Sequence, residues 1–119
     1  MKKIWYLSTC STCTRIIGEL NITSDNFEMY DLKDNPIPKK DLETIKNSLN
    51  CTYEDLFNKR AIKYHKSGLK EQIKVDEQFK EAILGEYTFI KRPIIQVDDE
   101  FFVGNSKKVV EACKAKLSD

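Results

Sequence analysis

The sequence predicts an α/β fold around a mixed four-stranded sheet, with the element order β-α-β, helical insertion, β-β-α. Two short runs rich in β-favouring residues, Lys3–Leu7 and Asn26–Tyr30, flank a segment with helical periodicity. Residues from about 38 to 86 carry repeated amphipathic helical patterns. Two further strand-like runs, Ile94–Val97 and Phe101–Gly104, enclose an acidic turn and precede a last helical segment.

The composition is that of one compact soluble domain. The chain has 119 residues, of which 33% are charged and 40% are hydrophobic. A chain of this length buries about two thirds of its unfolded surface, enough for a core without disulfides or metal. The 20 basic and 19 acidic residues leave a net charge of +1, which creates no long-range field for nucleic acid or anionic lipid. We therefore predict a single domain over residues 1–119, with the helical insertion at about 38–86, and neither a nucleic-acid nor a membrane partner.

The N-terminal residues do not resemble an export signal. After Met1–Lys3, only Ile4–Leu7 is apolar, which is shorter than the roughly 7 to 15 apolar residues of a signal peptide. No run approaches the ~20 apolar residues that cross a bilayer. Four cysteines are too few and too unevenly spaced for a disulfide scaffold. The sequence therefore predicts a cytoplasmic protein whose structural thiols stay reduced.

The N-terminal segment predicts a β-α-β unit. The strand Lys3–Leu7 runs into the polar loop Ser8–Cys13, and from Thr14 onward the apolar residues share one helical face. Cys13 therefore falls in or near the first turn of this helix. The second strand is Asn26–Tyr30, and the right-handed connection makes the two strands parallel neighbours.

The insertion is predicted to hold three helices. Pro38 suits the first position of one helix. Thr52 and Asp55 resemble a capping pair for a second, which Gly68 would end. The apolar residues from Val75 to Ile83 give a third amphipathic helix.

The C-terminal segment predicts a hairpin and a helix. Strands Ile94–Val97 and Phe101–Gly104 flank the turn Asp98–Glu100. Ser106 can cap a last helix. The complete element order is that of the thioredoxin-like arrangement.

The chemistry concentrates at Cys10 and Cys13, which form a Cys-x-x-Cys motif at the predicted helix N-terminus. Unsatisfied amide groups and the positive end of the helix dipole stabilise a thiolate there and lower its pKa from about 8.5 into a range of roughly 3.5 to 7.5. The two-residue spacing lets the second thiol resolve a mixed disulfide on the first. We therefore predict Cys10 as the nucleophile and Cys13 as the resolving thiol.

A zinc site is the alternative explanation of the cysteine pair, because Cys-x-x-Cys also suits zinc coordination. Such a site needs a second pair of ligands. Cys51 and Cys113 lie far apart in the sequence, and Cys113 falls on an apolar helical stripe where inert thiols are common. The single histidine, His65, lies in a basic stretch and is expected at the surface. We expect no metal site.

Three segments are typical of a known family: the strand running into Ser8–Cys13, the stretch Leu56–Arg60 followed by Tyr64 and Gly68-Leu69, and Lys91–Ile95 with Val103-Gly104 behind it. Over essentially its whole length the chain resembles the arsenate reductase (ArsC) family of thioredoxin-like proteins, which also contains the Spx regulators. The Lys-Arg-Pro-Ile segment is the most specific element, because Cys-x-x-Cys occurs in many thioredoxin relatives.

The resemblance implies a set of site residues. Pro93 is expected to be cis and to lie beside Cys10. Arg92 is expected near Cys10, where a guanidinium can hold a thiolate or an oxyanion by charge-assisted hydrogen bonds. The catalytic residues implied are Cys10, Cys13 and Arg92, and the substrate-binding residues implied are Arg60, Arg92, Pro93 and Asn105.

The chain departs from the arsenate-reducing members, which resemble one another in presenting three arginines to the oxyanion. Only the arginine at Arg92 is plainly matched. The place of the first falls on Asn58, while Arg60 matches the arginine of Spx-like members, and the third place falls on Asn105. Each lost charge-assisted hydrogen bond is worth about 1.5 to 3 kcal/mol, so an oxyanion would bind more weakly. Lys107 and Lys108 are the nearby candidates to substitute for the missing arginine.

The second motif position, a serine in arsenate reducers, is Cys13 here, so the chain can form its own disulfide. We therefore expect a thiol-disulfide oxidoreductase with no bound cofactor, reduced by glutathione, glutaredoxin or thioredoxin, with arsenate as a candidate substrate. The alternative is an Spx-like regulator, in which the oxidation state of Cys10 and Cys13 controls binding to RNA polymerase.

Overall fold

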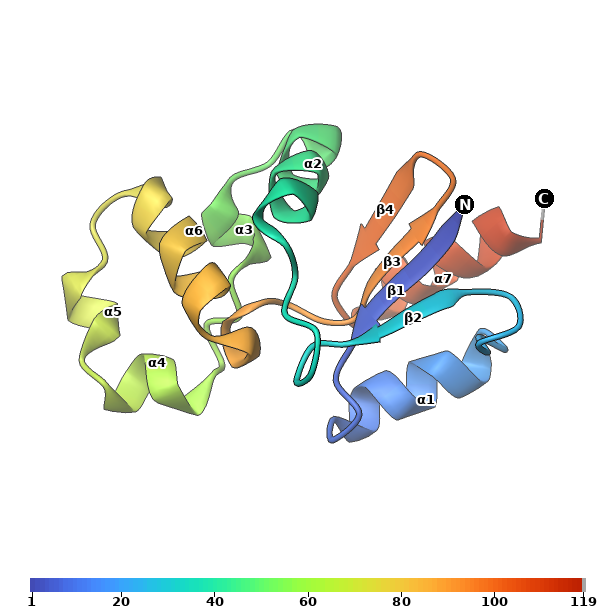
Figure 1. The fold of residues 1–119 in the computed structure, drawn as a ribbon, viewed down its shortest axis with the longest axis horizontal. Coiled ribbons are helices and arrows are strands. Elements are labelled where there is room, and N and C mark those ends of the chain that lie inside the picture. Colours follow the sequence, from blue (N-terminus) through green and yellow to red (C-terminus); the bar gives the residue numbers. More distant parts are fainter. Residues whose placement is uncertain (119) are drawn as a thin grey trace. The chain divides into compact units, whose positions relative to one another are not determined.

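The computed structural model describes residues 1–118, and the chain divides into two compact units (Figure 1). The first unit holds Met1–Pro36 together with the residues from Arg92 onward. The second unit holds Ile37–Lys91. The description of the chain as one domain with an insertion stays a prediction. Within residues 1–118, every helix is too short or too polar to span a lipid bilayer.

A mixed four-stranded sheet forms the centre of the first unit, as predicted. Its order is β2-β1-β3-β4. β1 pairs in parallel with β2 and antiparallel with β3, and β3 pairs antiparallel with β4. The strand bounds differ from the predicted ones by at most two residues, and are Lys2–Tyr6 for β1, Glu28–Asp31 for β2, Ile94–Val97 for β3 and Glu100–Val103 for β4.

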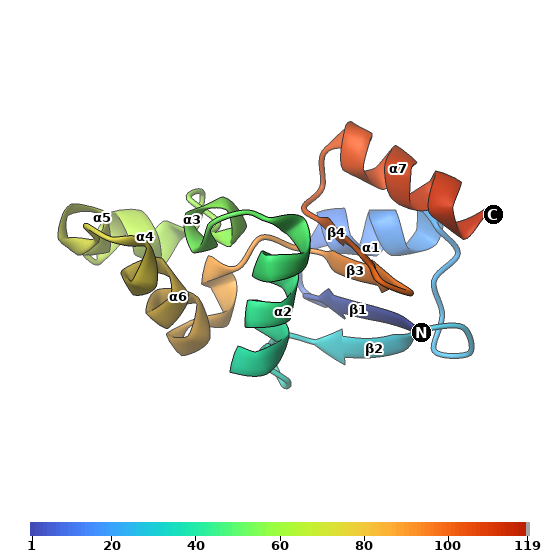
Figure 2. The same cartoon turned by 90° about the horizontal axis from the view of Figure 1, so that it is seen from above.

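Two helices, α1 (Ser11–Glu19) and α7 (Lys107–Leu117), pack on one face of this sheet (Figure 2). The core between them and the strands is apolar and fully or nearly fully buried, and consists of Ile4, Ile16, Leu20, Ile22, Phe27, Ile95, Val97 and Cys113. The predicted cap of α7 is confirmed, since the Ser106 hydroxyl accepts the Val109 amide at 3.2 Å. The first unit is thus a βαβ-ββα arrangement, and the thioredoxin-like fold follows.

The second unit is helical. Its elements are α2 (Lys39–Leu49), α3 (Tyr53–Leu56), α4 (Ile62–Lys66), α5 (Leu69–Gln72), α6 (Asp76–Gly85) and the 3-10 turn η1 (Tyr87–Phe89). The predicted capping pair is confirmed, because the Thr52 hydroxyl accepts the Asp55 amide at 3.1 Å and the Asp55 carboxylate accepts the Thr52 amide at 3.0 Å. Pro38 is the N-cap of α2 and not its first helical residue.

The prediction of a single helix from Thr52 to Gly68 is wrong. The helix stops at Leu56 because Phe57 adopts an extended backbone and pairs with Ile90 in an isolated antiparallel bridge. The helical pattern resumes only at α4, and Gly68 then takes a positive φ of 80°. Pairing with a residue more than thirty positions away has therefore overridden the local pattern.

Aromatic rings form the core of the second unit. The Phe57 ring lies within 4.9 to 5.1 Å of the rings of Tyr64, Phe79 and Phe89, measured between centroids. The predicted apolar stripe of α6 is only partly right, since Val75 is 58% exposed whereas Lys80 is buried and bonds Glu43 at 2.7 Å. A lysine in this position lays its alkyl stem along apolar surface while its ammonium stays paired.

Candidate active site

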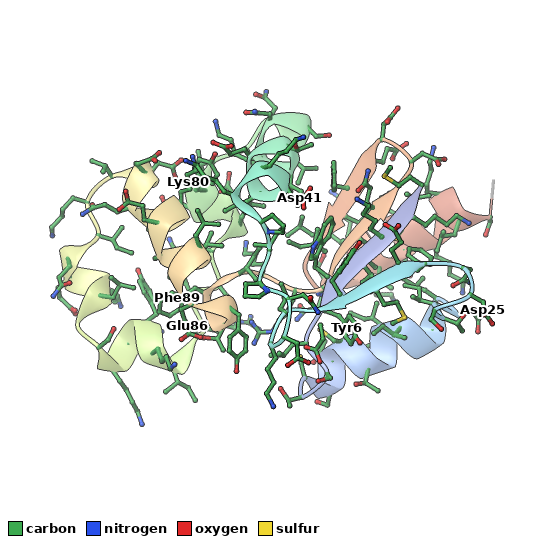
Figure 3. All side chains as sticks on the ribbon, in the orientation of Figure 1. Tyr6, Asp25, Asp41, Lys80, Glu86 and Phe89 are labelled. Atoms are coloured by element: carbon green, nitrogen blue, oxygen red, sulfur yellow. The ribbon has the colours of Figure 1, made fainter. Side chains whose placement is uncertain are left out.

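The ends of the strands in the first unit meet at one edge of the sheet. Tyr6 of β1 pairs with Asp31 of β2, so these parallel strands end together. At the same edge Trp5 pairs with Ile94, where β3 begins, and Ile94 pairs with Val103, where β4 ends. Tyr6 lies at this edge, whereas Asp25, which precedes β2, lies toward the opposite end of the sheet (Figure 3). The loop with Cys10, the Arg92-Pro93 segment and the Gly104-Asn105 segment therefore all leave the sheet at this edge.

A tight turn carries the chain from β1 to Cys10. The Cys10 amide donates to the Leu7 carbonyl at 3.0 Å and closes the turn. Cys10 has extended backbone angles and is the N-cap of α1, and its own carbonyl accepts the Thr14 amide at 3.1 Å. Its thiol consequently lies at the positive end of a nine-residue helix, where amide groups have no intrahelical partner.

The surroundings of Cys10 favour its thiolate. Burial by itself would raise the pKa of this thiol, but it is outweighed by hydrogen bonds from the Cys13 amide, the Cys13 thiol and the Thr12 amide and by the charge of Arg92, so the pKa of Cys10 is lowered. Cys10 is also half-buried and so retains access to solvent. A thiolate with these two properties is a nucleophile.

Cys13 is the opposite of Cys10 in exposure and acidity. It lies in the first turn of α1 with 0% of its surface exposed. Burial, together with the neighbouring Cys10 sulfur, raises the pKa of Cys13 to about 11. The Cys13 thiol therefore keeps its proton at neutral pH and donates a hydrogen bond to the Cys10 sulfur.

Arg92 and Pro93 lead into β3 beside this loop. The Arg92-Pro93 peptide bond is cis, the isomer that the family resemblance implies. The Pro93 carbonyl accepts the Gly104 amide at 2.9 Å, which links the start of β3 to the segment after β4. Gly104 has a positive φ of 97°, a conformation that suits glycine, and exposed Asn105 follows it. The structure thus brings together Cys10, Cys13 and Arg92, with Pro93 and Asn105 leaving the sheet at the same edge.

Arg60 belongs to the second unit, and its predicted role in substrate binding stays a prediction. It is exposed in the segment between α3 and α4, and its amide donates to the Asn58 side-chain oxygen at 3.2 Å. Asn58, which occupies the place of a family arginine, holds this segment against η1. Its amide donates to the Phe89 carbonyl at 2.6 Å and its side-chain nitrogen to the Thr88 carbonyl at 3.4 Å.

No role was predicted for Asp31, the last residue of β2. Its carboxylate accepts hydrogen bonds from the amides of Ser8 at 3.4 Å and Lys33 at 3.2 Å. Ser8 is part of the turn that carries Cys10. A sequence signal for this contact exists, because an acidic residue ends one of two adjacent parallel strands and a polar loop follows the other.

The cysteines outside the motif lie in different surroundings. Cys113 is completely buried in the core of the first unit, and burial raises its pKa to about 11. Cys51 is half-buried between α2 and α3, and burial also raises its pKa. Among residues 1–118, no group of three or more histidine, cysteine, aspartate or glutamate side chains is arranged to hold a metal ion.

Comparisons with known proteins agree with this fold. The ArsC family model matches residues 5–113. A search of curated proteins gave no match. Among solved structures, an arsenate reductase from Vibrio cholerae has a TM-score of 0.76 and 15% sequence identity, over 92% of this chain and 95% of that one.

Two further solved structures are similar. One is described as a possible arsenate reductase from Streptococcus mutans, with a TM-score of 0.74 and 22% identity over 95% of this chain and 97% of that one. The other is an arsenate reductase related protein from Brucella melitensis, with a TM-score of 0.67 and 18% identity over 93% and 92% of the two chains. At these identities the structures establish the thioredoxin-like fold, while the match of the family model over most of the sequence establishes membership. The chain belongs to the ArsC family.

Proposed function

We propose that this protein is a thiol-dependent reductase in which Cys10 is the nucleophile and Cys13 is the resolving thiol. The observation that carries the proposal is the contrast between the two sulfurs. Cys10 is accessible and its pKa is lowered, whereas Cys13 is fully buried with a pKa of about 11. The first is suited to attack an external substrate and the second to attack only a sulfur that is already bonded at Cys10.

The reaction with a disulfide proceeds in two exchanges. The Cys10 thiolate attacks one sulfur of the substrate, breaks the disulfide, and releases one thiolate that takes a proton from water. Cys13 then loses its proton and attacks the Cys10 sulfur, which forms the Cys10–Cys13 disulfide and releases the second thiol. Two electrons have passed to the substrate, and an external dithiol or two molecules of glutathione return them. No bound cofactor is required.

Arsenate is the second substrate class that we propose to test. Attack by Cys10 on arsenic would displace water and form a thioarsenate, and attack by Cys13 on the Cys10 sulfur would release arsenite and leave the same disulfide. Arg92 is proposed to hold the oxyanion, since its charge already acts on Cys10. Arg60, Pro93 and Asn105 are proposed to contribute to binding, Pro93 and Asn105 from the edge of the sheet at which Cys10 lies.

The test is NADPH-coupled turnover by the reduced protein, with arsenate and with a small disulfide as substrates. Each substrate is supplied with glutathione plus glutaredoxin, and separately with thioredoxin plus its reductase. Turnover that is lost in Cys10→Ser but kept in Cys51→Ser would support the proposal, and the system that sustains it would identify the donor. Full turnover by Cys10→Ser would refute it. Absence of turnover, with reversible formation of the Cys10–Cys13 disulfide, would instead favour a redox-responsive binding protein of the Spx type and direct work to RNA polymerase.

A further inference from the structure

Asp31 joins two loops at the edge of the sheet that carries the candidate site. Its side chain is half-buried and lies where β2 ends. One carboxylate oxygen accepts the Ser8 amide at 3.4 Å and the Lys33 amide at 3.2 Å, and the Ser8 hydroxyl is a further donor to the carboxylate. The carbonyl of the same residue accepts the amides of Asp34 at 3.0 Å and Asn35 at 2.8 Å. Asp31 thus organises its own turn and reaches across to the turn after β1.

The contact with Ser8 leads to Cys10 by a short and constrained path. The Leu32 amide donates to the Tyr6 carbonyl at 2.7 Å, which fixes the two strand ends immediately before the turn. The turn then closes through the hydrogen bond from the Cys10 amide to the Leu7 carbonyl. Ser8 lies inside this closed turn. The hydrogen bond from its amide to the Asp31 carboxylate therefore restrains the segment that places Cys10 at the N-terminus of α1.

We propose that Asp31 is a positioning residue for Cys10: its carboxylate holds the turn from Leu7 to Cys10 so that the thiolate meets the amide groups at the N-terminus of α1. The inference rests on the proposed function, in which the Cys10 thiolate is the nucleophile. Asp31 acts through the backbone at Ser8 and takes no proton from the substrate.

The protonation state of Asp31 agrees with this role. Burial opposes its ionisation, but the Ser8 hydroxyl, the Lys33 and Ser8 amides and the Lys33 charge outweigh burial and hold the pKa of Asp31 below its usual value. The group is therefore a carboxylate, an acceptor of hydrogen bonds, throughout the pH range in which a cysteine ionises.

A positioning role and a simple charge effect predict opposite results. The negative charge of Asp31 can only oppose formation of a thiolate nearby, so a pure charge effect predicts that removing it lowers the pKa of Cys10. Loss of the hydrogen bonds between Asp31 and the turn instead weakens the alignment of Cys10 with the Thr12 and Cys13 amides. Because these amides stabilise the thiolate, the pKa of Cys10 then rises.

The experiment measures the rate at which iodoacetamide alkylates Cys10 as a function of pH, in a Cys51→Ser background, with mass spectrometry locating the modified residue. Asp31→Ala is expected to raise the pH midpoint of alkylation by about half a unit, which lowers the rate roughly threefold at pH values well below the midpoint. Asp31→Asn keeps an oxygen that can accept from Ser8, and it is expected to restore part of the lost rate. Asp34→Ala is the matched control. It removes a neighbouring carboxylate, while the backbone amide of residue 34 still donates to the Asp31 carbonyl.

Circular dichroism and the urea midpoint show that each variant is folded. If Asp31→Ala does not fold, Ser8→Ala takes its place, because it removes one donor to the carboxylate and is expected to give a smaller upward shift. A midpoint in folded Asp31→Ala that is unchanged or lower, or an equal shift in Asp31→Ala and Asp31→Asn, would overturn the positioning role alone. An ordinary thiol midpoint near ~8.5 in the parent protein would overturn the proposed function, and this is measured before any Asp31 variant is made.

Discussion

The thiol of Cys13 donates a hydrogen bond to the sulfur of Cys10 across the first turn of α1. This contact has opposite effects on the two groups. It stabilises the Cys10 thiolate and lowers the pKa of Cys10, while it fixes the proton on Cys13 and contributes to the pKa of about 11 there.

Removing the Cys13 thiol should make Cys10 a weaker acid. In Cys13→Ala the hydrogen bond to the Cys10 sulfur is lost, so the pH midpoint for alkylation of Cys10 by iodoacetamide is expected to rise. Cys13→Ser keeps a hydroxyl donor and is expected to raise the midpoint less. Rate against pH, with the modified site identified by mass spectrometry, checks this. Equal midpoints in the parent protein and Cys13→Ala would show that the thiol has no influence on Cys10.

Cys13→Ser should also arrest the exchange at the mixed disulfide. With Ellman's reagent the parent protein is expected to release two thionitrobenzoate anions at the Cys10–Cys13 pair and to retain none there. Cys13→Ser should release one and keep the other bonded to Cys10. Both proteins carry Cys51→Ser, so that this half-buried thiol does not add to the count. An adduct that persists in the parent protein would mean that Cys13 does not resolve it.

Arg92→Lys should separate the charge of Arg92 from its shape. Lysine keeps the positive charge near Cys10, so the alkylation midpoint is expected to change little. The planar guanidinium group that binds an oxyanion through two hydrogen bonds is lost, and the KM for arsenate is expected to rise at least roughly tenfold, the lower limit for the loss of one charge-assisted hydrogen bond. The KM for neutral hydroxyethyl disulfide should not change. Arg15→Lys, on the exposed side of α1 where Arg15 pairs with Glu19, is the matched control. A parallel rise for both substrates would point to general disruption.

Cys113 should matter for stability and not for chemistry. It is completely buried among apolar side chains, so Cys113→Ser places a hydroxyl where no polar partner is expected and should cost about 1 to 3 kcal/mol of unfolding free energy. Cys51→Ser, at a half-buried site, should cost less than this. Urea denaturation measures both. The alkylation rate of Cys10 in folded Cys113→Ser should equal that of the parent, and a large loss would show that α7 influences the site.

Asp55 should make stability depend on pH at the acidic end. The Thr52 amide and hydroxyl hold the pKa of Asp55 below its usual value, so its contribution is present above the ordinary carboxyl pKa of about 4 and is lost as pH falls through the lower folded value. Asp55→Asn should therefore have a lower urea midpoint than the parent protein at pH 6. Near pH 2 the two urea midpoints should become nearly equal. Asp99→Asn, at the exposed β3–β4 turn, is the control. A constant difference between Asp55→Asn and the parent at both pH values would exclude this linkage.

Local patterns predicted much of the fold. The strands, the hairpin, and the caps at Thr52 and Ser106 all depend on residues close in the sequence, and each is confirmed within two residues. The parallel pairing of β1 with β2 followed from the handedness of the β-α-β connection, and it is also confirmed. The resemblance added the cis bond before Pro93, for which no local pattern was available.

Contacts between distant residues could not be predicted in this way. Phe57 leaves the helical pattern because it pairs with Ile90, and Lys80 is buried because Glu43 on another helix pairs with it. No functional role was predicted for Asp31, because its contact with Ser8 exists only once β1 and β2 lie side by side. In each case the deciding partner lies more than twenty positions away in the chain.

The strand order has a consequence for how the molecule opens. β1 and β3 are the two inner strands and pair with a neighbouring strand on both sides. β2 and β4 are the edge strands and pair on one side within the sheet. Amide hydrogens of inner strands exchange with solvent deuterium more slowly than those of edge strands, because the whole sheet must separate before they are released. Cys10 follows one inner strand and Arg92 precedes the other. Fraying of the outer strands would therefore leave both groups anchored to the inner strands, which open last.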